Sequence, residues 1–196
     1  IKSNQMDSHQ MDSHQMDSHQ MDSYLSFELN RNISNDNCMV ENLLSTCNSY
    51  YEKPVHNLQD MKMRNTKVKG DIFECFTKRY LKDIYGLKEV WLLHEIPLEL
   101  KATLNLCKRD YGIDLVGIDN NDKLYAIQSK FRKHNKHRKS SVSWKELSTF
   151  YALCARTGPY DKYMVFTTAD YVNRIGKKSE KDITIKYNKL LKLSHF

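Results

Sequence analysis

The stretch from Tyr111 to Phe131 reads YGIDLVGIDNNDKLYAIQSKF and contains two apolar runs separated by a polar cluster. The runs Ile113–Ile118 and Leu124–Phe131 carry Ile, Val, Leu, Tyr and Phe, which favours strands. Asp119–Lys123, between them, consists of residues that tolerate turn conformations. The pattern predicts a β-hairpin, and its apolar neighbours indicate strands that are buried inside a sheet.

Amphipathic helices lie on both sides of this hairpin along the chain. Apolar residues between Asp71 and Gly86 recur at spacings of three and four, which predicts a helix that ends at the glycine. Ser143 and Glu146 form a capping-box pattern before a second helix that runs to about Ala155. The pattern predicts further strands at Val90–Ile96 and Tyr163–Thr168. This order predicts an α/β fold with a mixed sheet and helices on both faces.

Two segments fit these patterns less well. Leu98–Leu106 reads as a less regular segment after Pro97. Glu180–Leu193 fits a helix by its apolar spacing, although Ile183–Ile185 also fits a strand.

The charge divides the chain into two unlike parts. The whole chain of 196 residues carries 31 Lys and Arg against 24 Asp and Glu, a net charge of +7. Residues 1–66 hold five basic and nine acidic side chains, whereas residues 67–196 hold 26 basic and 15 acidic ones. We expect the compact domain to span residues 67–196.

The N-terminal part repeats a five-residue unit, Gln-Met-Asp-Ser-His, from Gln5 onward. Each unit has one apolar residue, and a period of five fits neither a helix nor a strand. We therefore expect residues 1–35 to form a disordered low-complexity tail and residues 36–66 to form a linker with a short helix. The histidines of the repeat would bind a metal ion only if the tail became ordered around it.

Several classes of protein are excluded by composition. No window approaches the roughly 18 to 20 consecutive apolar residues of a membrane span, and the chain opens without the apolar segment of a secretory signal. The first residue, Ile1, is compatible with a fragment of a longer protein. Five scattered cysteines without a C-x-x-C pair fit neither a disulfide framework nor a zinc site. We expect an intracellular protein of the cytoplasm or nucleus that is not secreted and has no membrane partner.

Polar residues gather at one end of the predicted hairpin. Side chains alternate along a strand, so Gln128 and Lys130 share one face and Ser129 points to the other. A turn centred on Asn121 would place Asp114 opposite Gln128. The carboxylate of Asp114, the side-chain carbonyl of Gln128 and the backbone carbonyl of Ser129 are oxygen ligands that suit Mg²⁺ or Mn²⁺. Lys130 would stabilise the charge that develops on a phosphate during hydrolysis.

Each of these residues also has a simpler interpretation. Asp114 fits a turn residue, Gln128 an ordinary strand residue, and Lys130 an edge charge that discourages strand association. The joint spacing beside apolar neighbours favours a site over three unrelated residues. Glu74 follows Asp71 by three residues, so it fits a capping box of the first helix as well as a place in the site.

A basic segment leaves the second strand of the hairpin directly. It carries six basic residues: Lys130, Arg132, Lys133, Lys136, Arg138 and Lys139. Such a run is often only a solvated loop. Beside the candidate site it would instead bind the phosphate backbone of DNA, with an affinity that falls as salt rises.

Asp114 followed by Gln128-Ser129-Lys130 resembles the active-site signature of the PD-(D/E)xK nuclease superfamily, in the Gln-x-Lys form of its Mrr-like restriction endonuclease branch. The resemblance extends over about residues 67–175 and implies a restriction-endonuclease-like mixed β-sheet flanked by helices. The segments that carry it are Lys69–Glu74, Tyr111–Val116, Tyr125–Lys130, Trp144–Tyr151 and Val165–Thr168.

The resemblance implies a role for each site residue. Asp114 and Gln128 would be metal ligands, Lys130 the catalytic lysine, and Glu74 a supporting acid near the metal. The usual second acid is here the uncharged Gln128, which weakens the attraction for a cation by one charge. Nuclease-like regions joined to helicases in large DNA viruses are also similar, although the chain carries no Walker A motif. A homodimer and a fused or associated helicase are the protein partners that the resemblance suggests.

Together these patterns predict a metal-dependent nuclease, an endonuclease, that hydrolyses DNA phosphodiester bonds by in-line attack of a metal-bound water. The alternative from another class is a catalytically inactive nucleic-acid-binding module of the same fold, part of a larger helicase-type protein. A third interpretation is a structural accessory domain of a larger polypeptide.

Overall fold

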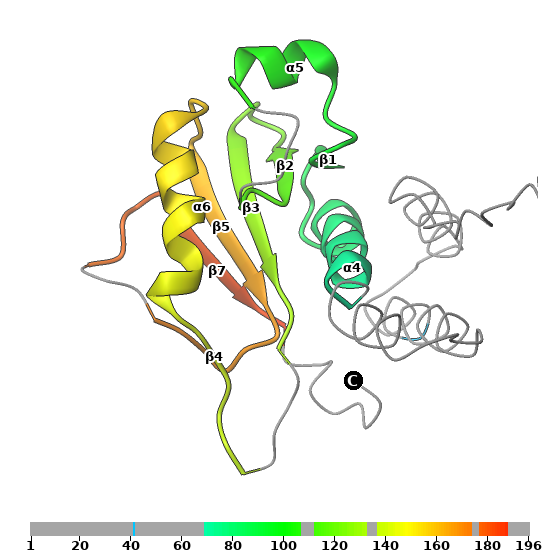
Figure 1. Cartoon of the computed structure of the whole chain (residues 1–196). Helices are drawn as coiled ribbons and strands as arrows, with labels where there is room; N and C mark the ends of the chain where they lie inside the picture. Colours follow the sequence, from blue (N-terminus) through cyan, green and yellow to red (C-terminus); the bar gives the residue numbers. More distant parts are fainter. Residues whose placement is uncertain (1–40, 42–68, 107–111, 133–136, 174–176, 188–196) are drawn as a thin grey trace, which may run out of the picture.

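The computed structural model describes residue 41 and residues 69–106, 112–132, 137–173 and 177–187. Figure 1 shows a sheet with α4 and α6 packed beside it. The elements in chain order are α4 (Lys69–Asp83), β1 (Glu89–Leu92), α5 (Leu98–Thr103), β2 (Leu115–Ile118), β3 (Leu124–Lys130), β4 (Ser141–Val142), α6 (Trp144–Arg156), β5 (Lys162–Thr167), β6 (Tyr171–Val172) and β7 (Asp182–Lys186).

The main sheet has five strands in the order β1-β2-β3-β5-β7. β1, β2 and β3 pair antiparallel, whereas β3, β5 and β7 pair parallel, so the sheet is mixed as predicted. Leu115 pairs with Ile127 and Ile118 pairs with Leu124, which is the register that a turn centred on Asn121 requires. The predicted hairpin is therefore confirmed, together with its register.

The turn of the hairpin is held by the carboxylate of Asp119. Its Oδ1 accepts the N–H groups of Asn121 at 2.8 Å and Lys123 at 3.0 Å, and its Oδ2 accepts the hydroxyl of Tyr125 at 3.2 Å. The N–H of Lys123 is the main reason why the pKa of Asp119 lies below its usual value, because a hydrogen bond to the charged form favours that form. The turn lies at the opposite end of the strands from Asp114 and therefore sets the register without touching the candidate site.

The helix α4 covers one face of the sheet with its apolar side. Phe73 and Phe76 contact Phe166 of β5, with ring centroids 5.6 Å and 6.4 Å apart, and Phe76 also contacts Tyr187 at 5.0 Å. The chain leaves the helix through Gly86 at φ +89°, a conformation that glycine adopts without a steric penalty, which confirms the predicted end. Other members of this core are Ile72, Leu81, Leu115, Ile127 and Met164.

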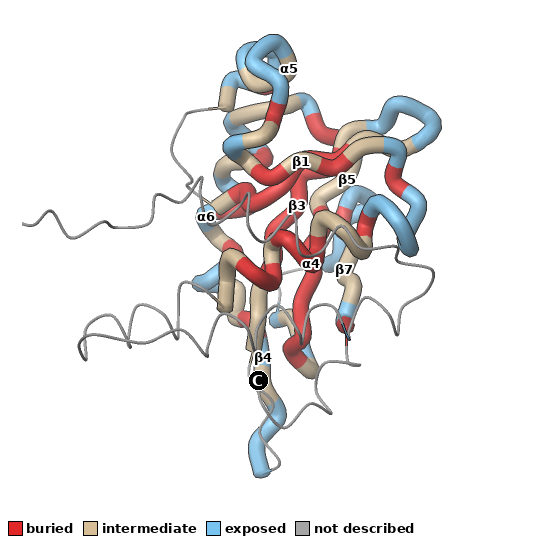
Figure 2. Tube along the Cα trace, turned by 90° about the vertical axis from the view of Figure 1, so that its right-hand side faces the viewer, coloured by how far each residue is buried: buried red, intermediate tan, exposed pale blue. Residues whose placement is uncertain are grey.

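The helix α6 covers the opposite face. Ser143 is its N-cap, and the predicted capping box with Glu146 is confirmed: Glu146 Oε2 accepts the Ser143 N–H at 2.9 Å. Figure 2 shows buried residues along β3, which is the middle strand of the sheet. The core on this side includes Val116, Ala126, Leu147, Phe150 and Val165.

Two predicted segments near the first strand differ from the structure. The strand predicted at Val90–Ile96 ends at Leu92, because the chain turns there and the carboxylate of Glu95 accepts the Leu92 N–H at 2.9 Å. The segment Leu98–Leu106, expected to be irregular, contains the short helix α5, which begins directly after Pro97. Proline is favourable at such a start because its fixed φ suits the first turn and its missing N–H is not needed there.

The C-terminal segment forms a strand where a helix was one expectation. Residues Asp182–Lys186 are β7, which pairs parallel with β5, so the helix predicted over Glu180–Leu193 is wrong for this part and the strand interpretation of Ile183–Ile185 is correct. A small second sheet pairs β4 with β6. The tail at 1–35 and all of the linker at 36–66 except residue 41 lie outside the described residues. Among the helices that the structure describes, none has the length and apolar character to cross a membrane.

Gly112 lies two residues before Asp114 and contacts α6. It has φ +123°, and a Cβ added there would lie 3.3 Å from the backbone nitrogen of Phe150. Gly112→Ala should therefore lower the free energy of unfolding by about 1–2 kcal/mol, since a side chain is strained at this φ and the helix backbone cannot easily move. Denaturant unfolding measures the change.

Gly70 in α4 is the matched control for this substitution. Within the described ranges, no heavy atom outside its own helix backbone lies within 4 Å of a Cβ added there, so Gly70→Ala should raise stability by about 0.5 kcal/mol through helix propensity. Equal stability of the two variants would contradict the account of Gly112.

Candidate active site

Asp114 lies directly before β2, outside the regular β2–β3 ladder. Its N–H donates to the carbonyl of Ile127 at 3.0 Å, and its carboxylate Oδ2 accepts the N–H of Ser129 at 2.7 Å. Asp114 is 6% exposed, and acidic residues are rarely buried to this degree. The backbone and the carboxylate of Asp114 are therefore both tied to β3, at the residues on either side of Gln128.

Gln128 is buried in the middle of the candidate site. It is 2% exposed, and its side-chain oxygen Oε1 has no hydrogen-bond partner among the described residues. A buried carbonyl without a partner costs free energy, so this oxygen is suited to an additional ligand such as a hard cation. The residues present therefore fit a divalent metal ion.

Ser129 anchors β3 on the other face of the sheet. The hydroxyl of Thr77 donates to the carbonyl of Phe73 at 2.7 Å and also lies 2.9 Å from the Ser129 hydroxyl, so the Ser129 hydroxyl is the donor in the second contact. The backbone carbonyls of Ile127 and Ser129 point to the same side of β3, since peptide groups alternate along a strand. The Ser129 carbonyl is therefore directed past the end of β2, on the side where Asp114 lies.

Lys130 ends β3 and is partly buried. It shares its strand face with Gln128, on the side covered by α6. Its carbonyl accepts the hydroxyl of Thr167 at 2.6 Å and the N–H of Thr168 at 3.4 Å, which fixes its backbone against β5. The ammonium group is close enough to Glu146 of α6 for its positive charge to lower the pKa of that carboxylate.

The pKa of Glu146 reflects this basic surrounding. Partial burial raises the pKa, but the N–H and hydroxyl of Ser143 and the positive charges of Arg132 and Lys130 lower it, and the net shift is downward. Glu146 therefore carries its negative charge beside Lys130 at neutral pH.

Glu74 lies on α4, three residues before Thr77, and is partly exposed. The body of α4 covers the face of the sheet opposite to Gln128 and Lys130. Among the residues that the structure describes, no three His, Cys, Asp or Glu side chains form a group suited to a metal ion. The proposed ligand set therefore depends on the amide of Gln128 and the carbonyl of Ser129, and the place of Glu74 in it stays a prediction.

The basic segment is only partly described. Arg138 and Lys139 are exposed, and the ammonium of Lys139 donates to the hydroxyl of Tyr171 at 2.8 Å. Lys133 and Lys136 lie outside the described residues. Arg132 is partly buried and contacts α6 through Glu146. The exposed cations belong to the segment that follows β3 and leads to β4.

The sequence patterns did not identify two groups of residues that contact the site backbone. Thr167 and Thr168 at the end of β5 hold the carbonyls of Lys130 and Arg132, and Thr77 of α4 contacts Ser129. The capping box identified Glu146 as a helix residue, but its ion pair with Arg132 joins segments fourteen residues apart. Two adjacent threonines at the end of a predicted strand are the signal that could have indicated the first group.

A family model described as a restriction endonuclease, of the Mrr type, matches residues 81–195. Asp114, Gln128, Ser129 and Lys130 lie inside this range, whereas Glu74 lies before it. No curated protein matches the chain.

One similar solved structure is the ATP-dependent Type ISP restriction-modification enzyme LlaBIII bound to DNA, with 26% sequence identity and a TM-score of 0.46. The match covers 70% of this chain but 8% of that enzyme, so the chain spans a small part of its length. The family model covers more than half of the 196 residues, and the chain therefore belongs to the Mrr-like restriction endonuclease family.

Proposed function

We propose that the chain is a divalent-metal-dependent endonuclease that hydrolyses the phosphodiester bonds of DNA. Membership of the restriction endonuclease family supports nuclease activity. The single observation that carries the metal dependence is the buried Oε1 of Gln128, which lacks a partner in the described part of the chain. Asp114 is hydrogen-bonded to both sequence neighbours of Gln128, Ile127 and Ser129. A bound cation would satisfy this oxygen and balance the carboxylate charge.

The ion would be held by Asp114, Gln128 and the backbone carbonyl of Ser129, with Glu74 as a further acid. When bound, Mg²⁺ or Mn²⁺ supplies polarisation of a phosphate oxygen and activation of water near neutral pH. Lys130 donates hydrogen bonds to the phosphate oxygens as negative charge grows on them. Because Thr167 holds the Lys130 carbonyl, the backbone from which this side chain extends is fixed.

DNA is the proposed substrate because exposed cations follow the strand of Lys130 in the sequence. Arg138 and Lys139 are exposed, and Lys133 and Lys136 belong to the same basic segment. Cations of this kind contact the phosphate backbone, which positions DNA without reading its sequence. The homodimer, the associated helicase and the intracellular location that the sequence suggests stay predictions.

The second candidate function is a catalytically inactive nucleic-acid-binding module of the same fold. The uncharged side chain of Gln128 favours it, because a site with one carboxylate fewer attracts a divalent cation less strongly. The two candidates share DNA binding and differ in cleavage.

Lys130→Ala should lower the rate of DNA cleavage by about 100-fold or more, because it removes the cation that stabilises charge on the phosphate. The measurement is single-turnover cleavage of a labelled DNA duplex with Mg²⁺ or Mn²⁺, with DNA binding measured separately. Lys88→Ala removes the same charge from an exposed pair with Asp122 and serves as the control, with an unchanged rate expected. If the intact chain and Lys130→Ala bind DNA equally and neither cuts any substrate, the binding module replaces the nuclease.

Asp114→Asn should abolish the rise in melting temperature that Mg²⁺ or Mn²⁺ produces, because it removes the only charged ligand of the buried pair. Thermal unfolding with and without the metal measures this rise. Asp122→Asn, which changes an exposed carboxylate, should keep it. An equal metal-induced rise in Asp114→Asn and the unmodified chain would contradict the ligand assignment.

Gln128→Glu should have opposite effects on stability in the absence and presence of metal. Without metal, two buried carboxylates would face each other, so the melting temperature should fall. With metal, the additional charge should lower the half-saturating Mg²⁺ concentration by about tenfold. Melting curves over a Mg²⁺ titration measure both effects, and an unchanged half-saturation would count against Gln128 as a ligand.

A further inference from the structure

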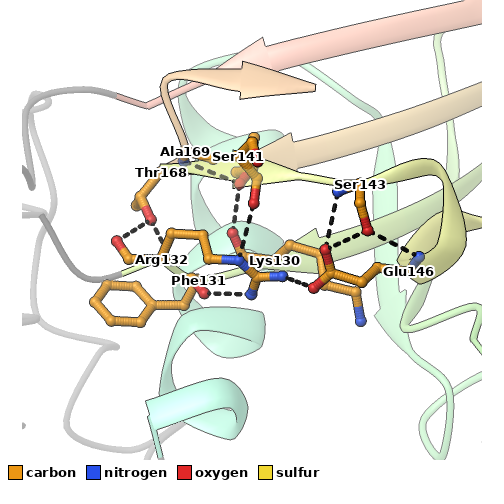
Figure 3. Close-up of polar contacts among 9 residues, drawn as sticks. Lys130, Phe131, Arg132, Ser141, Ser143, Glu146, Thr168 and Ala169 are labelled. Carbon is orange, nitrogen blue, oxygen red and sulfur yellow. Dashed lines mark hydrogen bonds and ion pairs between the residues drawn. The ribbon is translucent and has the colours of Figure 1, made fainter. Parts of the chain in front are cut away.

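Arg132 lies two residues after β3, and the sequence predicts that it contacts DNA phosphates. Every nitrogen of its guanidinium is engaged within the protein: Nη1 donates to the Phe131 carbonyl at 2.9 Å, Nε donates to the Ser141 carbonyl at 3.4 Å, and Nη2 forms an ion pair with Glu146 Oε1. Figure 3 shows the guanidinium between these three residues. The side chain is 28% exposed, so most of it is withdrawn from solvent.

Glu146 receives donors on both of its carboxylate oxygens. Oε1 pairs with Arg132, while Oε2 accepts the N–H of Ser143 at 2.9 Å and its hydroxyl at 2.8 Å. One carboxylate therefore caps the start of α6 and joins that helix to the segment after β3 (Figure 3). The same carboxylate lies in the field of Lys130.

The backbone of the same segment is held from the other side by β5. The strand ladder between β3 and β5 ends at Lys130 and Thr167. Beyond it, the Arg132 N–H donates to the Thr168 hydroxyl oxygen at 2.7 Å, and this hydroxyl donates to the Arg132 carbonyl at 2.9 Å. The chain is thus fixed by side chains at the point where strand pairing stops.

We propose that Arg132 and Glu146 form a positioning pair that sets the place of Lys130, and that Arg132 acts through the protein instead of contacting DNA. This inference rests on the proposed nuclease function. The pair joins Arg132, two residues after Lys130, to α6, the helix that covers the face of β3 from which the Lys130 side chain extends. Fixing a reactive group in this way lowers the entropy lost on reaching the transition state.

The energetic character of the pair supports a geometric role over a stabilising one. The Arg132 and Glu146 side chains are 28% and 41% exposed, and ion pairs exposed to this degree contribute little to global stability. A planar guanidinium that bonds three acceptors in different directions restricts geometry in a way that an ammonium group cannot.

The test uses the full chain with Arg132→Gln, Arg132→Lys and Glu146→Gln. Glutamine at position 146 can still accept the Ser143 N–H of the capping box, so this variant removes the charge and keeps the cap. Each variant should cut DNA about tenfold more slowly in single turnover at saturating DNA. The double variant Arg132→Gln with Glu146→Gln should be no slower than either single variant, because both remove the same interaction.

Binding of a labelled DNA duplex at several salt concentrations separates positioning from phosphate contact. The slope of log affinity against log salt should be unchanged in Arg132→Gln, whereas Arg138→Gln, which removes an exposed cation, should reduce it by about one. Asp119→Ala, at the far turn of the hairpin, controls for stability: its melting temperature should fall while its cleavage rate stays that of the unmodified chain.

Amide hydrogen exchange at Lys130–Arg132 gives a readout that does not need activity. Exchange there should be faster in Arg132→Gln and Glu146→Gln than in the unmodified chain. Unchanged exchange, a salt slope reduced by about one in Arg132→Gln, or rates that follow melting temperature alone would each overturn the positioning pair. An unmodified chain that cuts no DNA would overturn the proposed function instead, while the slope and exchange would still decide whether Arg132 positions the segment.

Discussion

The candidate site depends on the hydrogen bond between the Ser129 N–H and the carboxylate of Asp114. This contact, at 2.7 Å, lies beyond the end of the β2–β3 ladder. Without it, the N–H of the buried residue Ser129 would lose this hydrogen bond. The contact extends the pairing between the two strands by one side chain and keeps Asp114 beside β3. This bond takes the place of a backbone hydrogen bond between the strands, and it joins two of the residues that we propose as metal ligands, Asp114 and Ser129.

The two faces of β3 have different physical tasks. On the α4 side, Ser129 bonds Thr77 beside a core of tilted aromatic rings, which holds the strand in place. On the α6 side, Gln128 and Lys130 supply polar groups, and Lys130 lies near Glu146 in the first turn of the helix. Alternation along a strand allows adjacent residues to serve support and chemistry at once, since their side chains point in opposite directions.

The end of the parallel strands is stabilised by side chains and not by further pairing. Thr167 and Thr168 bond the carbonyls of Lys130 and Arg132, and the capping carboxylate of Glu146 joins the same segment to α6. Such contacts limit the motion of the strand end that carries Lys130.

Local patterns were sufficient for the hairpin, its register and the two main helices. The register follows from the position of Asn121 between two apolar runs, and the start of α6 follows from Ser143 and Glu146, because both depend on residues a few positions apart. The same spacing predicts that Asp114, Gln128 and Lys130 are neighbours.

Only the tertiary structure decided the features that depend on distant partners. The segment Asp182–Lys186 is a strand because β5 offers it an edge, although its apolar spacing also fits a helix. The sequence shows Arg132 as one cation in a basic run, and only folding brings Glu146 of α6 to its guanidinium. Short-range periodicity records which way a side chain points, but not which group from another element meets it, since that depends on how the helices and strands pack.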